Sequence, residues 1–384
     1  MKQLLFTILA FVLIFLFLCG KTDKKLAPKL VDLTGYVNPM IGTDKEGNVF
    51  PGACLPFGMV QLSPDNGYQG VKAYNYAKTS ILGFSHTQLS GTGDGTLTNY
   101  CNILIMPTVG ELKVFPGIAK SPDLQARKNL QKRLRDLPES ERQKNESLSQ
   151  AERRARTRAM LADERKKIMA ELSKSGIDTT KAFKGYESVY SHSEEEASPG
   201  YYAVQLKDYN IKAELTATER AGFHRYTFPE TKESHVIIDV THSLTADRNA
   251  YVKVLNNNQV EGYVTTDSEG DNSMPLKCYF FAEFNKQFSS FGTWSGENIK
   301  PGQNEMAGKD GVGAYVNFST TQGEQVLVKV GISFVSIDGA KKNLAAEIPH
   351  WDFDKIRDQA KAVWNEKLNK VQVKGGTNDQ KTTL

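Results

Sequence analysis

Side chains suited to binding chemistry gather in one polar, glycine-rich stretch near the N-terminus, Ser85 to Gly95. It opens with Ser85-His86-Thr87 and ends with Ser-Gly-Thr-Gly-Asp-Gly over Ser90 to Gly95, so hydroxyl, imidazole and carboxylate groups alternate with residues that let a backbone approach a ligand closely. A hydroxyl both donates and accepts hydrogen bonds, which suits a ligand that is itself rich in hydroxyl groups. The stretch lacks the lysine of a phosphate-binding loop, so it does not predict a nucleotide site.

Other reactive residues are scattered. Asp65, Asp94, Glu214, Glu261 and Asp271 show no paired spacing, and the six histidines form no Ser-His-Asp pattern. No Cys-x-x-Cys spacing occurs either, which argues against a zinc site. From these residues we assign no catalytic residue and no metal ligand.

Three short apolar runs must position the polar stretch: Met59 to Leu62, Ile81 to Phe84 and Cys101 to Met106. Each has the length of a strand and is bounded by glycine and proline, so we expect strands here. Polar loops between strands are the usual place for binding residues, because the sheet holds them rigidly.

Several long motifs occur in a fixed order. They are Tyr36 to Thr43 (Tyr-Val-Asn-Pro-Met-Ile-Gly-Thr), Phe50 to Asp65, Ile81 to Gly95, Glu194 to Tyr202, Lys212 to Pro229, Val260 to Tyr263 and Val363 to Thr383. Together they resemble the N-terminal signature of glycoside hydrolase family 92, the calcium-dependent, inverting, exo-acting α-mannosidases. The resemblance implies a large β-sandwich followed by a helical catalytic domain, whereas this sequence stops at Leu384.

Inversion at a glycosidic bond needs two carboxyl groups far enough apart to admit a water. In the resembled family both come from the helical domain, as do most calcium ligands. The resemblance therefore implies calcium as a cofactor of the family, with its ligands mostly in a domain that we expect to be absent. We carry over no general acid, no general base and no metal ligand.

The resemblance does imply that loops of the sandwich help to enclose a terminal mannose. The substrate-binding candidates are Tyr68, Tyr74, Ser85, His86, Ser90, Thr92 and Asp94. Alternatively, Ser90 to Gly95 is a structural turn with capping hydroxyls. For His86 we favour a hydrogen-bonded core or interface position over a catalytic base.

Two departures from the family pattern affect this edge. Glu46-Gly47-Asn48 stands where His-Gly-His is usual, and no tryptophan precedes Tyr74-Asn75-Tyr76. Tyr68 is the nearest upstream aromatic residue and could stack on a pyranose. Trp294, in a glycine- and serine-rich stretch, is an alternative sugar platform if it is exposed.

The first residues resemble an export signal. Lys2 precedes an apolar run from Leu4 to Leu18, and Cys19 follows at once. We expect residues 1–19 to be a bacterial lipoprotein leader with Cys19 as the lipid anchor, and residues 20–33 to be a tether. The alternative is an uncleaved N-terminal anchor; either way the chain belongs to the exported cell envelope, in the periplasm or at the outer membrane.

Three further cysteines, Cys54, Cys101 and Cys278, lie in or beside apolar runs, where a small buried thiol is common. One disulfide among the three is also conceivable, and the sequence does not assign it.

A change of composition marks residues 117–185. Between Lys120 and Lys184 there are 18 basic and 10 acidic residues, against a net charge of +4 for the whole chain. Long runs of Lys, Arg, Glu, Gln and Ala favour helix, so we expect an inserted helical hairpin. Its basic face is either a solvated surface or a contact with anionic lipid or an acidic polymer. Because the rest of the chain is slightly acidic, nucleic-acid binding is not predicted.

From residue 200 onward strand patterns dominate. We expect strands at 201–206, 211–218, 222–228, 235–241, 259–265, 277–284, 313–319 and 325–337. Two helices should follow, one capped by Asp338 and one with an apolar stripe from Phe353 to Leu368. The predicted fold is mainly β: a large antiparallel β-sandwich over residues 34–337, a charged helical hairpin inserted at 117–185, and two linker helices within 338–384.

We therefore expect the glycan-facing N-terminal domain of an α-mannosidase that processes glycoprotein glycans, inactive as this chain alone. Its partners would be mannose-containing glycans, a separately encoded catalytic domain, and a membrane through the N-terminal anchor. The alternatives are a non-catalytic carbohydrate-binding lipoprotein and a structural envelope protein that uses the basic hairpin.

Overall fold

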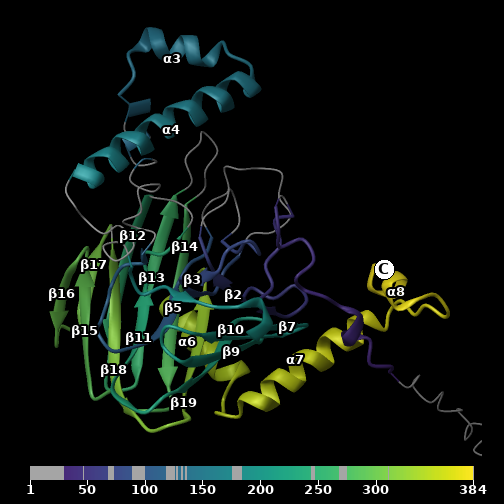
Figure 1. Ribbon diagram of the computed structural model, residues 1–384. Helices are drawn as coiled ribbons and strands as arrows, with labels where there is room; N and C mark the ends of the chain where they lie inside the picture. The colour runs from purple at the N-terminus through teal and green to yellow at the C-terminus, as the bar shows by residue number, and fades with distance from the viewer. Residues whose placement is uncertain are drawn as a thin grey trace, which may run out of the picture.

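The computed structural model describes residues 30–45, 47–67, 73–88, 100–117, 126, 129–130, 133–134, 136–174, 184–243, 247–267, 275–309 and 311–383 (Figure 1). Within these residues the architecture is a sandwich of two large antiparallel sheets, with helices at its end and on one outer face. The predicted mainly-β sandwich is confirmed.

The larger sheet has nine strands among the described residues, and every neighbouring pair in it is antiparallel. In spatial order they are β17 (Glu305–Gly308), β12 (Asp247–Val254), β13 (Gln259–Asp267), β14 (Leu276–Phe284), β19 (Glu324–Ser333), β10 (Ala221–Phe228), β9 (Ile211–Ala217), β8 (Tyr201–Leu206) and β7 (Glu195–Ser198).

The facing sheet has eight strands in the described part of the chain. Their order is β1 (Ala53–Cys54), β2 (Gln61–Asp65), β4 (Gly83–Ser85), β5 (Leu104–Val109), β11 (Thr231–Asp239), β18 (Val312–Thr320), β15 (Ser290–Ser295) and β16 (Asn298–Pro301). A separate short pair joins β3 (Ser80–Ile81) to β6 (Ser188–Val189). The N-terminal motif region thus forms one edge of this sheet.

One continuous apolar core fills the space between the sheets. Phe84, Val236 and Phe318 come from the eight-stranded sheet, and Tyr226 and Phe280 from the nine-stranded sheet; each is almost completely buried. Close-packed aromatic and β-branched side chains account for most of the stabilisation of such a sandwich, because burying each one removes a large apolar area from water.

Two helices cover the outer face of the nine-stranded sheet. Helix α6 (Ile337–Glu347) lies on β19 and β14, and α7 (Phe353–Leu368) lies across β8, β9 and β10. They share a second apolar cluster with the sheet, which includes Phe223, Leu344 and Phe353. Strand β19 is therefore buried on both faces over its second half.

Polar side chains cap the N-termini of both helices, and the cap predicted for α6 was wrong. Ser336, not Asp338, caps α6, because its side chain accepts a hydrogen bond from the amide of Gly339 at 2.9 Å. Asp338 instead lies in the first turn, where its charge favours the helix dipole. Asp352 caps α7 through the amide of Lys355. A short helix α8 (Asn378–Thr383) follows.

The start of the described chain is tied to α7. The amides of Val31 and Leu33 donate to the side chains of Asn369 and Asn365, at 3.2 and 2.9 Å. The 3-10 helix η1 (Thr34–Tyr36) follows directly, so the two ends of the described chain lie side by side (Figure 1).

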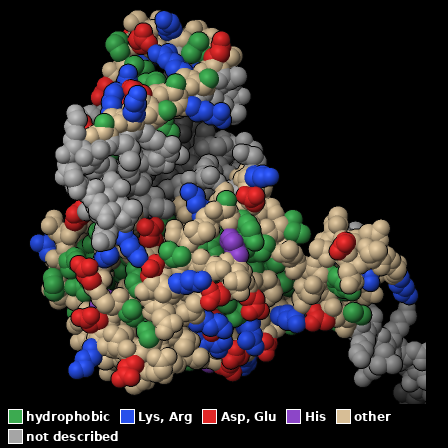
Figure 2. All heavy atoms as spheres, viewed as in Figure 1, with side chains coloured by type: hydrophobic (Ala, Val, Ile, Leu, Met, Phe, Trp, Pro, Cys, Tyr) green, Lys and Arg blue, Asp and Glu red, His purple; other side chains and the backbone are tan. Residues whose placement is uncertain are grey.

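The inserted hairpin consists of α3 (Glu139–Glu146) and α4 (Gln150–Lys174), which lie beyond one end of the sheets (Figure 1). Ser149 and Glu152 form a reciprocal capping box at the start of α4. Arg156 pairs with Glu141 across the two helices at 2.8 Å. Charged side chains of both signs cover its surface (Figure 2).

Several strands were not predicted: β1, β6, β7, β12, β15, β16 and β17. Strand β16 is exposed at all four positions, so it carries no apolar signal to recognise. The alternative for Trp294 was wrong, because its side chain is completely buried in the core.

Cys54, Cys101 and Cys278 are free thiols, and burial raises the pKa of Cys54 to about 11 and that of Cys278 to about 12. None of the described helices is both long enough and apolar enough to cross a membrane.

Candidate functional site

Asp65, at the end of β2, organises the edge where binding residues were predicted. Its carboxylate accepts hydrogen bonds from Ser85 Oγ (2.9 Å), Gln88 Nε2 (3.0 Å) and His242 Nε2 (2.6 Å). All four side chains are almost completely buried. A buried carboxylate is costly unless such donors surround it, so this group fixes three separate chain segments against one another.

His86 lies beside this group in a buried chain of hydrogen bonds. Its Nδ1 lies 2.7 Å from the carbonyl oxygen of Ile103, so Nδ1 carries the proton and donates. Its Nε2 must then accept from Nε2 of His224, 3.0 Å away. The remaining nitrogen of His224, Nδ1, accepts from the hydroxyl of Tyr226 at 2.8 Å. Both imidazoles are thus neutral, each in one tautomer.

The electrostatics agree with this assignment. Burial lowers the pKa of His86 to about 4, and burial together with the neighbouring His86 lowers that of His224 well below its usual value. Neither ring is accessible to solvent. This chain of hydrogen bonds therefore links β10 of one sheet to the segment after β4 of the other.

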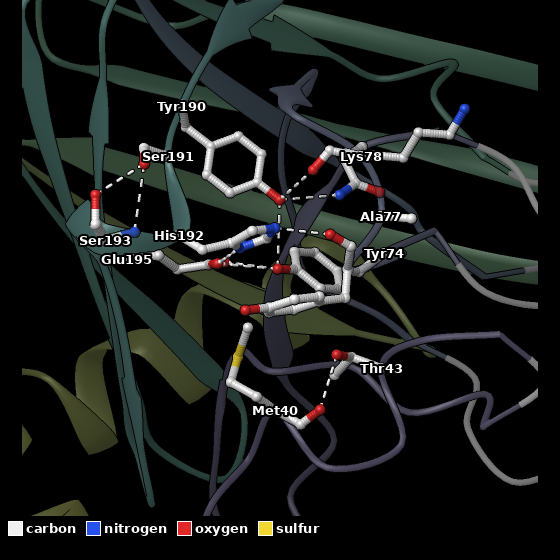
Figure 3. Close-up of polar contacts among 12 residues, drawn as sticks. Met40, Thr43, Tyr74, Ala77, Lys78, Tyr190, Ser191, His192, Ser193 and Glu195 are labelled. Carbon is white, nitrogen blue, oxygen red and sulfur yellow. Dashed lines mark hydrogen bonds and ion pairs between the residues drawn. The ribbon is translucent and has the colours of Figure 1, made fainter.

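A second polar cluster surrounds Glu195, the first residue of β7 (Figure 3). Its carboxylate accepts hydrogen bonds from the hydroxyls of Tyr74 (2.8 Å) and Tyr202 (2.6 Å), and from Nδ1 of His192 (2.6 Å). The side chain of Glu195 is only 2% exposed. Burial, followed by the charge of Glu195, raises the pKa of Tyr74 far above its usual value, so this phenol remains a donor.

Asn66 and Tyr190 connect the two clusters. The hydroxyl of Tyr190 lies 3.3 Å from both the Tyr74 hydroxyl and the side-chain nitrogen of Asn66, and it donates to the carbonyl of Lys78 at 3.0 Å. Because Asn66 follows Asp65 in the chain, the backbone joins the Asp65 cluster directly to the Glu195 cluster.

A pocket of about 440 Å³ opens beside Glu195. One wall is the loop Asn38 to Asp44, and the other is formed by Tyr76, His192 and Glu195. The rings of Tyr76 and His192 are stacked, with centroids 3.8 Å apart and planes 9° from parallel. Segments about 120 to 150 residues apart in the sequence thus build one site.

Asp44 and Glu195 both line this pocket, but they do not have the properties of an acid–base pair. Both oxygens of Glu195 already accept hydrogen bonds, from Tyr74, Tyr202 and His192. A general base needs a free lone pair directed at a water, and a general acid needs a proton to give. Glu195 therefore acts as an anchor that fixes the aromatic side chains around it.

Of the residues predicted to bind substrate, Tyr74, Ser85 and His86 are described. Tyr74 belongs to the Glu195 cluster, Ser85 to the Asp65 cluster and His86 to the histidine chain. Tyr68, Ser90, Thr92 and Asp94 lie outside the described residues, as does Cys19. The contacts predicted for all of these residues with a ligand stay predictions.

Sequence reasoning missed Glu195, His192, Tyr76 and His242 as site residues. Glu195 lies within the Glu194 to Tyr202 motif, so the motif was recognised but its role was not. Only the pairing of β7 with β8 and the approach of the Tyr74 segment bring these groups together.

No group of three or more His, Cys, Asp and Glu side chains that could hold a metal ion occurs among the described residues. That part of the chain does not fit the calcium that the family resemblance implies.

Comparison with protein families gives two matches. The model of the glycosyl hydrolase family 92 N-terminal domain matches residues 36–137 and 166–333. The model of the glycosyl hydrolase family 92 catalytic domain matches residues 339–384. The first match passes over residues 138–165, which contain α3 and the first part of α4.

Among solved structures, a family GH92 α-mannosidase from Bacteroides thetaiotaomicron is 30% identical, with a TM-score of 0.70 over 92% of this chain and 40% of its own. It has also been solved in complex with mannoimidazole. An inverting family GH92 mannosidase from the same bacterium, 22% identical, shares the fold with a TM-score of 0.65 over 93% of this chain and 39% of its own.

A curated relative, described as an uncharacterized secreted glycosidase from Arthroderma benhamiae, is 24% identical over 372 residues. The alignment covers 90% of this chain and 39% of that protein, so the chain spans about two fifths of the length of the relatives it matches. Since the N-terminal domain model covers most of the sequence, the chain belongs to glycosyl hydrolase family 92.

Proposed function

We propose that this chain is the N-terminal, glycan-facing part of an α-mannosidase that hydrolyses terminal α-mannosides of glycoprotein glycans. The observation that carries the proposal is the match to the family 92 N-terminal domain, supported by the 30% identity to an α-mannosidase over 92% of the chain. The complex of that relative with mannoimidazole supports a mannose-like ligand.

In this proposal the chain supplies a wall of the substrate site and not the acid and base. The Glu195 carboxylate, which lines the described pocket, supports this division, because both of its oxygens already accept hydrogen bonds, from Tyr74, Tyr202 and His192. The helical catalytic domain, in the same or a separate chain, would then provide the acid, the base and most ligands of the calcium that the family implies.

The proposed substrate contacts are the predicted ones, Tyr68, Tyr74, Ser85, His86, Ser90, Thr92 and Asp94. Ser85 and His86 are buried and hydrogen-bonded within the sandwich. Tyr74 is equally buried, with its hydroxyl donating to Glu195. We propose that these three residues act by positioning the segments around them, and that direct contacts come from Tyr68, Ser90, Thr92 and Asp94.

We further propose that the chain is exported and lipid-anchored through Cys19. The apolar run Leu4 to Leu18 supports export, and so does the description of the curated relative as secreted. Metabolic labelling with a fatty acid tests the anchor: the label should be present in the native chain and absent from Cys19→Ala.

The test of the main proposal measures both binding and turnover. The purified chain is expected to bind α-linked mannobiose and to release no mannose from it, with or without calcium. Release of mannose in proportion to the concentration of the chain would contradict the proposed division of labour. Selective binding of a sugar other than mannose would contradict the proposed substrate.

A further inference from the structure

The pocket beside Glu195 has walls of fixed shape. In the Asn38 to Asp44 loop, the Asn38 side chain accepts from the amide of Met40 at 3.0 Å, and the Thr43 hydroxyl donates to the carbonyl of Met40 at 2.8 Å. Gly42 has φ +83°, a conformation that few other residues adopt without strain. These contacts hold the loop as a preformed wall, which a ligand does not have to order on binding.

The opposite wall is equally constrained. His192 uses both ring nitrogens, one with Glu195 at 2.6 Å and one with the carbonyl of Tyr76 at 2.7 Å, so its ring has a single orientation. Tyr76 stacks on that ring and is 41% exposed. Among the described residues the Tyr76 hydroxyl makes no hydrogen bond. Tyr76 therefore presents an exposed aromatic ring with an unbonded hydroxyl, held in place by the fixed ring of His192, which is itself bonded to Glu195 (Figure 3).

The lining restricts the chemistry of a ligand. The pocket is lined by Asn38, Met40, Ile41, Gly42, Thr43, Asp44, Tyr76, His192 and Glu195. No lysine or arginine is in this set, and both ring nitrogens of His192 are already bonded, to Glu195 and to the carbonyl of Tyr76, so the lining presents no free cationic donor to a phosphate or any other anion. Exposed Ile41 and Tyr76 offer apolar contact, while the Asn38 and Asp44 side chains and the loop backbone offer hydrogen-bond acceptors.

A pyranose ring has this combination of properties: one face of C–H groups, and hydroxyls that donate to acceptors at its rim. A volume of about 440 Å³ also falls within the range of roughly 300–1,000 Å³ found for small-molecule sites. We propose that this pocket binds one neutral pyranoside unit of the glycan, with Tyr76 as its platform and the Asn38 to Asp44 loop as its rim. The nature of the ligand rests on the proposed function; the location rests on the pocket itself.

Binding of methyl α-mannopyranoside and methyl α-glucopyranoside to the full chain tests this proposal, measured by saturation-transfer NMR and titration calorimetry. Tyr76→Ala should weaken the binding of whichever glycoside binds by about tenfold, which corresponds to about 1.4 kcal/mol. Tyr76→Leu keeps an apolar side chain but removes the aromatic ring, and it should also weaken the binding of the glycoside. This second variant tests the proposal if Tyr76→Ala folds poorly. Tyr251→Ala is the matched control. Tyr251, in β12, is a half-buried tyrosine that stacks on Tyr263 and does not line the pocket.

The outcomes separate this proposal from the proposed function. If a mannoside binds equally well to the native chain and to both Tyr76 variants, the pocket is not the sugar site, although the mannoside preference stands. If only a glucoside binds and Tyr76 controls its affinity, the pocket proposal stands and the proposed mannosidase function fails. If neither glycoside binds the native chain, or if Tyr251→Ala weakens binding as much as Tyr76→Ala, the pocket proposal is overturned.

Discussion

The Nε2 atoms of His86 and His224 lie 3.0 Å apart in the interior of the sandwich, where neither ring reaches solvent. One proton lies between these two nitrogens, and it belongs to His224, because His86 donates its only ring proton to the carbonyl of Ile103. The pair therefore links the two sheets only while both rings are neutral. A second proton would place charge in the core and would remove the acceptor that the link requires.

We predict that the chain loses stability on mild acidification. Burial keeps the pKa of His86 at about 4, against about 6.5 in the unfolded chain, so the unfolded chain binds more protons between these pH values. The contribution of neutral His86 to the free energy of unfolding is complete above pH 6.5 and is lost as the pH falls towards 4. By pH 5 the free energy of unfolding should fall by about 2 kcal/mol, measured by urea denaturation at pH 7 and pH 5.

The control for this prediction is His224→Gln. The amide can still donate to His86 but does not titrate, so the pH dependence between 7 and 5 should become weaker than in the native chain. An unchanged slope would mean that His224 makes no contribution to the acid sensitivity.

Removing the Glu195 carboxylate should be strongly destabilising. In Glu195→Ala the hydroxyls of Tyr74 and Tyr202 and the imidazole of His192 lose their common acceptor in a buried site. We expect a loss of about 3 kcal/mol in the free energy of unfolding, because an unsatisfied buried donor costs about 1–3 kcal/mol. Glu196→Ala, next to it but exposed, should change stability by less than about 0.5 kcal/mol. Equal effects of the two variants would contradict the anchoring role.

Much of the sandwich could be predicted, because strands such as β8, β9 and β10 combine β-branched or aromatic residues with turn residues at both ends. Strands β16 and β17 could not, since they lie largely exposed at sheet edges and carry no apolar alternation. The site was harder still. His86 and His224 are 138 residues apart, and only the stacking of two sheets brings them together. The motifs located Tyr74 and His86, but not the partners that hold them.

Helix α6 should be sensitive to a single methyl group. A Cβ added to Gly331 in β19 would lie 2.3 Å from the carbonyl oxygen of Ala340, which is backbone and cannot rotate away. Gly331→Ala should therefore displace α6 and cost about 2 kcal/mol, seen in thermal unfolding. Gly35→Ala is the control, because nothing lies within 4 Å of the added atom. If Gly331→Ala left the thermal unfolding midpoint unchanged, α6 would be able to shift on the sheet at little cost in free energy.

Arg225 should hold α7 against the sandwich. Its guanidinium pairs with Glu214 at 2.8 Å and Asp354 at 3.1 Å, and it lies 4.3 Å above the ring of Phe353. Burial acts to raise the pKa of Glu214, but hydrogen bonds from Arg225 and Tyr201 outweigh burial and hold that pKa below its usual value. Arg225→Ala leaves this buried carboxylate with only the more distant ammonium group of Lys212, 3.5 Å away, so we expect a loss of about 3 kcal/mol and faster amide exchange across α7.

Arg357, which is half-buried, provides the comparison for Arg225. It pairs with Asp354 and Asp358 on the same helix, so Arg357→Ala should cost less than about 1 kcal/mol. If Arg225→Ala left amide exchange in α7 unchanged, the apolar contacts of Phe353 and its neighbours alone would hold the helix.

The inserted hairpin should be dispensable for the sandwich. The family match passes over residues 138–165, and the charged contacts of α3 and α4 are largely made within the hairpin, as in the Arg156–Glu141 pair. Replacing residues 138–165 by a short glycine–serine linker should leave the thermal midpoint of the sandwich within a few degrees of the native value and leave binding at the Tyr76 pocket unchanged. A large drop in the midpoint would show that the hairpin supports the sheets, and lost sugar binding would place it beside the site. Because α4 carries Arg153 and Arg158 on exposed positions within the replaced segment, the same variant also tests for contact with anionic lipid: native and shortened chains should bind phosphatidylglycerol vesicles equally if these charges form only a solvated surface.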